Sequence, residues 1–157
     1  MVMRKEEKAL TGFLPGLLSG LVFAGANEAD LSADRDDGLL TAEEISFLDL
    51  SNVDLVVLSA CESGLGRPQG GEGMLGFRRT FRAAGAKTVI SSLWRVSDES
   101  TNELMRAFYE RLWLQGESTQ AALRGAQLDM LKQNRIENEG HALPSTWGAF
   151  VLDGAWE

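Results

Sequence analysis

The sequence is poor in the two residues that most often carry protein chemistry, since it holds one cysteine and one histidine among 157 residues. One cysteine excludes an internal disulfide framework and a cysteine-rich metal site. One histidine argues against a zinc site, so we expect neither a metal nor another cofactor. A lone cysteine suits a reducing compartment, and we therefore expect a cytoplasmic protein.

Basic residues are also scarce. Lys and Arg number 15 against 23 Asp and Glu, which gives a net charge of −8. This balance argues against general binding to nucleic acids or anionic membranes, because both need basic patches. Arg78, Arg79 and Arg82 form one local basic cluster, which a solvated helix face explains about as well as a binding site. We expect no nucleic-acid or membrane partner.

Long apolar runs are missing too, because none approaches the ~18–20 residues that a transmembrane helix needs. Residues 1–8 are charged, residues 9–23 are largely apolar, and residues 24–26 could pass for a signal-peptide cleavage site. Glu6 and Glu7 lie within the charged part, however, and glycines and a proline interrupt the apolar part. We interpret the segment as a loop that leads into a strand.

The remaining sequence has the composition of a globular protein, with 44% apolar residues. A chain of this length can bury a sizeable core, and we expect a single domain over residues 1–157. Residues 55–60 form an unbroken apolar run, which is typical of a strand buried on both faces of a parallel sheet. Further strands are predicted by the apolar or β-branched runs at 19–24, 87–93 and 147–152.

Helices are predicted between these strands. Thr41 followed by Glu44 matches a capping box at the start of a short helix. Residues 74–84 have apolar residues at helical spacing, and Gly85 is expected to end this helix as a C-terminal cap. The alternation of strands and helices predicts an α/β fold, with a mostly parallel sheet covered by helices on both faces.

Two later helices are predicted to begin at serine caps, Ser97 and Ser118, and the second is expected to fray over the polar residues 133–140. Each has an apolar stripe that should face the core. The stripe residues are Leu104, Met105, Phe108 and Leu112 in the first helix, and Ala122, Leu123, Ala126 and Met130 in the second.

Cys61 follows the apolar run at 55–60, and a glycine-bearing loop comes directly after it. A thiol at the carboxyl end of a buried strand lies where open α/β sheets place their chemistry. Backbone N–H groups of a glycine-rich turn lower the pKa of a thiol and bind an oxyanion. Cys61 is therefore the candidate nucleophile, against the plainer interpretation of a small buried residue.

Two other side chains are candidates for the same site. Asp98 follows the third predicted strand, on the edge that should carry Cys61, where an acid could bind a basic substrate side chain. The plainer interpretation of Asp98 is a charge that favours the start of a helix. His141 lies 80 residues after Cys61 and could pair with it only if its polar loop folds over that edge. We interpret His141 as a surface residue.

Two motifs point to ligands only weakly. Residues 71–76 match the glycine pattern of dinucleotide-binding loops, but the pattern does not directly follow a strand. Residues 33–44 resemble a calcium loop that ends on Glu44, but Ala33 and Arg35 occupy positions that need oxygen ligands. We expect turn glycines in the first motif and a solvated acidic turn in the second.

Several segments occur in an order that resembles the C-terminal half of CHAT domains, and the likeness extends over residues 17–156. The most telling one is Asp54-Leu-Val-Val-Leu-Ser-Ala-Cys-Glu-Ser-Gly-Leu-Gly66. The matching segments, in order, are 17–27, 37–45, 54–66, 70–74, 85–94, 96–98 and 147–152. CHAT domains are similar to caspases and separases, and many are parts of bacterial signalling or defence systems.

This resemblance implies an α/β caspase-like three-layer sandwich with a mostly parallel sheet. It also implies a Cys-His peptidase that needs no metal and acts on a peptide or protein substrate. By the same likeness Cys61 is the nucleophile, and Asp98 lies near the primary specificity pocket. Tetratricopeptide or other partner regions are usual in the family.

In the family, the catalytic histidine stands in a His-Gly motif on a strand upstream of segment 17–27, and no histidine precedes that segment here. The leading hypothesis is therefore a peptidase fragment that lacks its N-terminal strands, is inactive alone and requires a His-bearing segment. The alternative is a non-catalytic interaction module of degenerate peptidase fold. A sheet without its upstream strands exposes an apolar edge, so we expect the isolated chain to aggregate or oligomerise.

Overall fold

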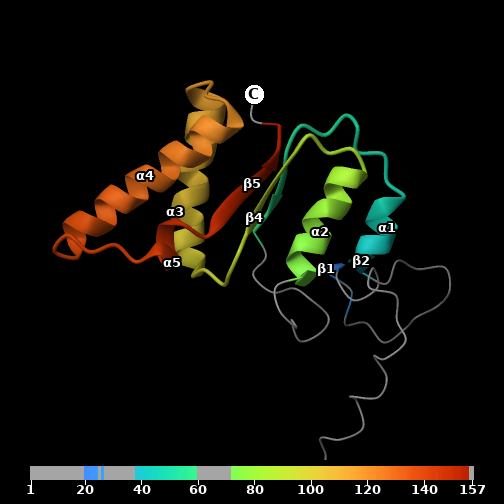
Figure 1. The fold of residues 1–157 in the computed structure, drawn as a ribbon, viewed down its shortest axis with the longest axis horizontal. Helices are drawn as coiled ribbons and strands as arrows, with labels where there is room; N and C mark the ends of the chain where they lie inside the picture. The colour runs from blue at the N-terminus through green and yellow to red at the C-terminus, as the bar shows by residue number, and fades with distance from the viewer. Residues whose placement is uncertain (1–19, 25, 27–37, 60–71, 156–157) are drawn as a thin grey trace, which may run out of the picture. The chain divides into compact units, whose positions relative to one another are not determined.

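The computed structural model describes residues 20–24, 26, 38–59 and 72–155, which have a mixed α/β fold (Figure 1). These residues form two compact units, and each is described by itself. Unit 1 contains strands β1 and β2 and helices α1 and α2. Unit 2 contains strands β3 to β5, helices α3 to α5 and the π-helical turn η2.

Unit 1 begins with two short strands. β1 (Gly20–Val22) pairs antiparallel with β2 (Leu39–Thr41) in a sheet of its own. A Cβ atom on Gly20 would lie 2.8 Å from the carbonyl oxygen of Leu40, so the absence of a side chain permits this close pairing. The strand predicted at 19–24 is thus present but shorter, and it does not join the sheet that contains β3 and β4.

Two helices complete unit 1. α1 (Ala42–Ser46) begins with the predicted capping box, which is confirmed in both directions. The Thr41 hydroxyl accepts a hydrogen bond from the Glu44 backbone at 3.2 Å, and the Glu44 carboxylate accepts one from the Thr41 backbone at 2.7 Å. α2 (Glu72–Ala83) begins two residues earlier than predicted. Its buried aromatic rings, in edge-to-face contact 5.3 Å apart, are those of Phe77 and Phe81.

The sheet of unit 2 has the strand order β3-β4-β5. β3 (Val56–Leu58) and β4 (Thr88–Ser92) run parallel, as the sequence predicted, with Leu58 opposite Ser91. β5 (Phe150–Gly154) runs antiparallel to β4. Only one of the strand pairs in the described ranges is therefore parallel, which differs from the mostly parallel sheet that we expected.

The short helix α5 (Pro144–Trp147) explains the direction of β5. Proline favours the first position of a helix, where its missing N–H costs no hydrogen bond. Leu93, directly after β4, donates its N–H to the carbonyl of Ala149 at 2.8 Å. The chain thus reaches the sheet at the carboxyl end of β4, and β5 has to run back along it. Because α5 includes Trp147, the strand predicted at 147–152 is shifted to later residues.

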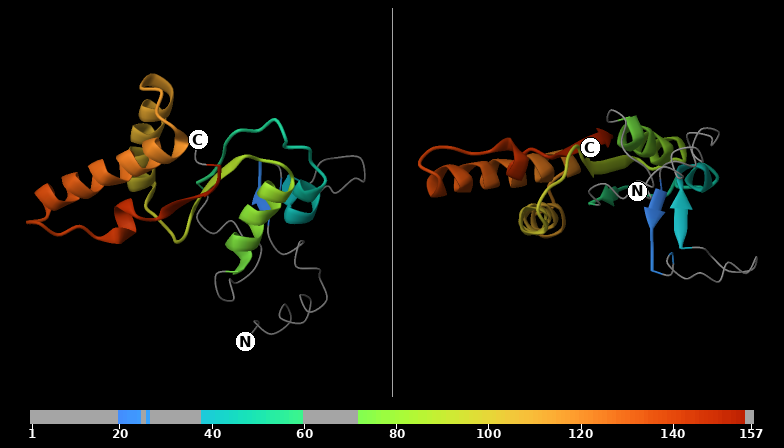
Figure 2. Two further views of the ribbon diagram at one scale, coloured as in Figure 1. Left: turned by 45° about the horizontal axis from the view of Figure 1, so that its top comes forward. Right: turned by 90° about the horizontal axis from the view of Figure 1, so that it is seen from below.

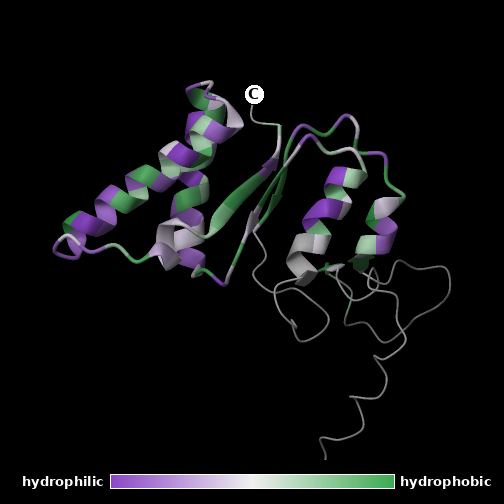
Figure 3. Ribbon diagram, viewed as in Figure 1, coloured by the Kyte–Doolittle hydropathy of each residue, from purple (hydrophilic) through white to green (hydrophobic). Residues whose placement is uncertain are grey.

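The core of unit 2 forms where helices α3 (Asp98–Tyr109) and α4 (Thr119–Glu137) pack against each other (Figure 2). Apolar and polar residues alternate around both helices, as Figure 3 shows. The apolar stripes are buried as predicted except at Leu112, which lies beyond the end of α3 and is half-buried, and they pack against Ile90 of β4 and Phe150 of β5. The buried stripe residues are Leu104, Met105, Phe108, Ala122, Leu123, Ala126 and Met130.

Side-chain hydrogen bonds define both ends of α4. The predicted cap is confirmed, since the Ser118 hydroxyl accepts from the Ala121 backbone at 3.4 Å. The helix ends at Glu137, within the stretch 133–140 where fraying was predicted, but residues 133–137 are still helical. Gln133 donates to the Glu137 carboxylate at 2.6 Å, and such contacts one turn apart stabilise a polar helix end. Across the described ranges, no helix combines the length and apolarity needed to cross a membrane.

Candidate functional site

The carboxyl ends of β3 and β4 define the candidate site. Because the two strands are parallel and Leu58 lies opposite Ser91, the segments that follow them leave the sheet at the same edge. The segment after β3 leads to Cys61, which lies outside the described residues. The segment after β4 leads to Asp98, at the start of α3. One edge therefore carries the beginnings of both segments that the sequence analysis selected.

Asp98 is exposed and occupies the first position of α3. The predicted cap before it is confirmed, since the Ser97 hydroxyl accepts from the Ser100 backbone at 3.2 Å. A carboxylate in the first helical turn is favoured by the helix dipole, so Asp98 has a structural role whether or not it binds a ligand. Its exposure leaves the carboxylate available to a basic group in solution.

Exposed apolar side chains lie between β4 and α3, and the sequence analysis missed them. Leu93 is 50% exposed and Trp94 is 41% exposed. The indole N–H of Trp94 donates to the carbonyl of Ser145 at 3.4 Å, which holds the ring beside α5. The sequence feature that could have revealed them is a pair of large apolar residues directly after a predicted strand. Open α/β sheets bind ligands at the edge where such residues lie.

His141 is exposed, as the sequence analysis expected. It follows α4 after a turn in which Glu139 and Gly140 have φ angles of 53° and 93°. Its backbone N–H donates to the carbonyl of Asn138 at 2.9 Å. These contacts fix the position of the backbone at His141 but assign no partner to its imidazole.

The two weak ligand motifs lie partly outside the described residues. Of the glycine motif at 71–76, residues 72–76 form the first turns of α2. Of the calcium-like loop at 33–44, only the end is described, and the carboxylate of Glu44 there serves the capping box of α1. No group of three or more metal-binding side chains occurs among the residues whose positions are described.

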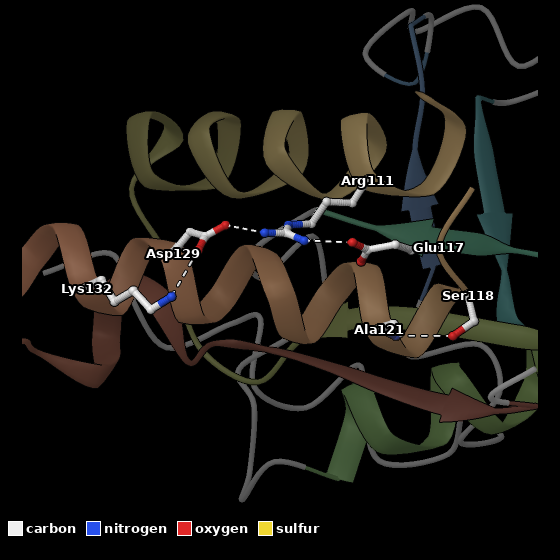
Figure 4. A network of polar contacts seen from close by, with 6 residues as sticks. All are labelled: Arg111, Glu117, Ser118, Ala121, Asp129 and Lys132. Atoms are coloured by element: carbon white, nitrogen blue, oxygen red, sulfur yellow. Dashed lines mark hydrogen bonds and ion pairs between the residues drawn. The ribbon is translucent and has the colours of Figure 1, made fainter. Parts of the chain in front are cut away.

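Arg111 of η2 (Glu110–Leu114) links this turn to the following loop and to α4 (Figure 4). Its guanidinium forms ion pairs with Glu117 at 2.8 Å and with Asp129. The hydrogen bond between Arg111 and Asp129 raises the pKa of the guanidinium and lowers the pKa of the carboxyl. A Cβ atom on Gly125 would lie 2.7 Å from the guanidinium carbon, so this glycine leaves room for the network.

A shallow groove of about 510 Å³ lies between β3 and η2. The rings of Tyr109 and Trp113 stack with centroids 4.5 Å apart and an angle of 17° between their planes. Burial raises the pKa of the Tyr109 hydroxyl, while Trp113 remains 70% exposed. The sequence analysis assigned Leu112 to an apolar stripe but missed this aromatic pair. The groove is lined by Asp54, Leu55, Val57, Tyr109, Leu112, Trp113 and Thr119.

Comparison with known proteins finds a family match over most of the chain. The family model described as the CHAT domain matches residues 11–155. Tetratricopeptide repeat protein 28 of Mus musculus is 35% identical over 117 residues, which cover 74% of this chain and 4% of that protein. Its counterpart of the same name in Homo sapiens is 33% identical over the same length. The chain thus spans about 4% of the length of these curated relatives.

Proposed function

The chain belongs to the CHAT domain family, and on this premise we propose that it contributes the nucleophile-bearing part of a cysteine peptidase with a caspase-like three-layer sandwich. Cys61 is the proposed nucleophile, and Asp98 is proposed to bind a basic side chain of the substrate. The observation that supports the proposal is the parallel register of β3 and β4. Because of it, the segment that leads to Cys61 and the segment that leads to Asp98 begin at the same edge of the sheet.

The proposed reaction is hydrolysis of a peptide bond through a thioester. The Cys61 thiolate attacks the carbonyl carbon, and backbone N–H groups of the glycine-rich loop stabilise the oxyanion. The amine leaves with a proton from the general acid, and water then hydrolyses the thioester. A histidine is the proposed acid and base for these proton transfers, and such a positioned group contributes roughly 10²–10⁴-fold to the rate.

The proposed partner is a His-bearing segment that does not belong to these 157 residues. The reason is that the sequence has one histidine, His141, which is exposed and stands where the family does not place its catalytic base. The names of the curated relatives support a tetratricopeptide-type partner region as the setting of such a complex. Since the nucleophile must stay a free thiol, we propose the cytoplasm as the compartment.

The test is a cleavage assay with and without a supplied histidine. The chain is combined with a strand ending in His-Gly, taken from a CHAT relative, and incubated with a peptide library that contains Lys and Arg. Mass spectrometry should detect cleavage only with the added strand, and Cys61→Ala should reduce it to background. Asp98→Asn should raise KM for basic peptides more than it lowers kcat.

Ser59→Ala is the matched control, because Ser59 is exposed and follows the same strand as Cys61. Its rate should equal that of the unchanged chain. Cleavage of the library by Cys61→Ala at the unchanged rate would contradict the proposal.

The second candidate function is a non-catalytic interaction module of the same fold. The exposed position of His141, the one histidine of the sequence, favours it. The two functions differ in the reactivity of Cys61 toward iodoacetamide. A thiol with an ordinary pKa near 8.5 reacts slowly at pH 6, whereas an activated thiolate reacts there at a rate close to its maximum. Slow alkylation at pH 6 in the presence of the His-bearing strand favours the interaction module.

A further inference from the structure

Arg78 on α2 is the one charged side chain that is buried among the described residues, with 7% of its surface exposed. It shares the inward face of the helix with Phe77 and Phe81, which are also buried. The Nε atom of its guanidinium is closed off from solvent and has no hydrogen-bond partner within the described ranges. A solvated helix face therefore does not explain Arg78, and charged side chains are almost never buried without a partner.

Arg111 of unit 2 shows how a partly buried arginine is usually accommodated. Its side chain is 24% exposed, and it pairs with the carboxylates of Glu117 and Asp129. Arg78 is buried more deeply, yet no ion pair within the described ranges includes it. Its own helix offers no acid, because the positions one turn before and after it hold three apolar residues and an arginine. The described part of the chain thus leaves Arg78 without a counter-charge.

An unpaired guanidinium at this position is prepared to bind an anion. Arginine keeps its positive charge when it is buried. The loss of hydration is unfavourable, and only an opposite charge with good hydrogen bonds offsets it. A ligand that supplies this charge meets a group that the fold has already removed from water, so little further desolvation opposes binding.

The geometry and charge of the guanidinium favour a carboxylate. The Nε–H and one terminal N–H group lie parallel on one edge, and they match the two oxygens of a carboxylate. A carboxylate also brings one negative charge, which balances the one unpaired positive charge. A phosphate group carries close to two negative charges at neutral pH, and the second would stay buried without a partner.

Exposed apolar side chains in unit 1 indicate that the carboxylate belongs to a protein segment. Val22 and Phe23 are adjacent at the end of β1, and Phe47 and Leu48 are adjacent after α1. All four are between 43% and 83% exposed. α1 packs against α2, the helix of Arg78 (Figure 1). Large apolar residues that gather on a surface are typical of protein contacts, whereas a free acid would leave them uncovered.

We propose that Arg78 is the carboxylate-binding residue of a docking site on unit 1 for a protein segment outside these 157 residues. An Asp or Glu side chain of that segment forms a bidentate ion pair with the guanidinium. Apolar side chains beside this acid cover the exposed apolar residues of unit 1. The site involves neither Cys61 nor Asp98, so its test is independent of peptidase activity.

The first test compares melting temperatures of the isolated chain. Arg78→Met replaces an unpaired buried charge with an apolar side chain, so the melting temperature should stay constant or rise by about 2–4 °C. Arg111→Met is the contrast, because it breaks existing ion pairs and should lower the melting temperature. A lower melting temperature for Arg78→Met would show that the chain supplies its own carboxylate, and it would overturn the proposal.

The second test selects the partner sequence from random peptides displayed on phage. The targets are the unchanged chain, Arg78→Met and Arg79→Met. Arg79 is exposed on the same helix, so Arg79→Met controls for the loss of a positive charge. The unchanged chain and Arg79→Met should select apolar peptides with Asp or Glu at one fixed position, and Arg78→Met should not select this acid. Peptides without a fixed acid, a failure to select any peptide, or the same peptides from all three targets overturn the proposal.

The third test measures the ion pair itself and separates a protein segment from a free anion. Replacing the acid of the selected peptide with its amide should weaken the Kd by about 30-fold for the unchanged chain, the size expected for a broken buried charge pair. The same replacement should change the Kd for Arg78→Met less than about twofold. Sodium acetate and sodium phosphate should each shift the melting temperature no more than sodium chloride at equal ionic strength. A larger shift that Arg78→Met abolishes would identify a small anion as the occupant and overturn the proposal.

Discussion

β3 and β4 are neighbouring parallel strands, and the more apolar of the two is the less buried. β3 consists of Val, Val and Leu, yet two of its three residues are only half-buried. β4 contains three hydroxyl residues among five, yet all five are buried. Position in the sheet explains the difference, since β4 has a strand on each side and β3 pairs with one described strand. The number of neighbours decides burial here, and composition does not.

The comparison also shows how a buried strand accommodates polar groups. The Thr88 hydroxyl donates to the Ala155 carbonyl at 2.8 Å. The hydroxyl oxygen of Ser91 is buried and has no hydrogen-bond partner among the described residues. A buried strand therefore tolerates hydroxyl groups at different energetic cost, depending on whether each finds an acceptor.

The largest expected effect is a difference in the free energy of unfolding between substitutions of one apolar residue in each strand. Ile90 of β4 is fully buried against α3 and α4, so Ile90→Ala should lower the free energy of unfolding by about 2–5 kcal/mol. Val57 of β3 is half-buried, and Val57→Ala should cost only about 1 kcal/mol. Urea denaturation followed by circular dichroism measures both values. Equal losses would show that β3 is covered as well as β4 in solution.

A second prediction concerns the network that holds η2 beside the groove at β3. Gly125→Ala improves helix propensity by about 1 kcal/mol but displaces the guanidinium of Arg111. Gly76→Ala in α2 meets open space and should give the full gain. We expect Gly125→Ala to be less stable than Gly76→Ala by at least about 1 kcal/mol. In the background of Arg111→Ala, Gly125→Ala should become stabilising. Thermal melting of the two single variants and the double variant measures this change of sign, and its absence would contradict the steric explanation.

The third prediction concerns the polar groups of β4. Ser91→Ala removes a buried hydroxyl that has no partner, so stability should stay constant or rise by up to about 1 kcal/mol. Thr88→Val removes a hydrogen bond and should lower stability by about 0.5–1.5 kcal/mol. Guanidinium denaturation of both variants measures which of the two loses more stability. A larger loss for Ser91→Ala than for Thr88→Val would show that Ser91 has an acceptor.

The smallest expected effect is a pH dependence near the groove. The hydrogen bond from Arg111 holds the pKa of Asp129 below its ordinary value of 3.8. A carboxyl with a lowered pKa in the folded state stabilises the protein above its unfolded pKa, and this contribution is lost as pH falls through the folded pKa. Asp129→Asn should cost less than about 1 kcal/mol at pH 7, because Asp129 is half exposed.

The difference between Asp129→Asn and the unchanged chain should shrink as pH falls from about 4, where a free carboxyl begins to bind a proton. Asp153→Asn on β5 controls for the loss of a charge, because Asp153 forms no ion pair within the described ranges. Melting curves at several pH values measure the trend. A difference that stays constant down to pH 2 would contradict this account of the ion pair.

Features that depend on a few neighbouring residues were predicted well. The capping box at Thr41, the caps at Ser97 and Ser118, and the buried stripe around Phe108 follow from side chains within one helical turn. The end of α4 lies within the predicted stretch 133–140, but polar composition alone does not reveal the hydrogen bond that keeps residues 133–137 helical. The candidate edge was also predicted, since a parallel pair of strands places both following segments there.

The sequence by itself determined the family likeness, the main helices and their caps. It also selected Cys61 and Asp98 as site residues, and both roles stay predictions. Only the tertiary structure decided the separate sheet of β1, the direction of β5, the half-exposure of β3 and the Tyr109–Trp113 groove. The reason is physical. Helix caps and stripes arise between residues a few positions apart, whereas pairing and exposure depend on segments that meet from distant parts of the chain.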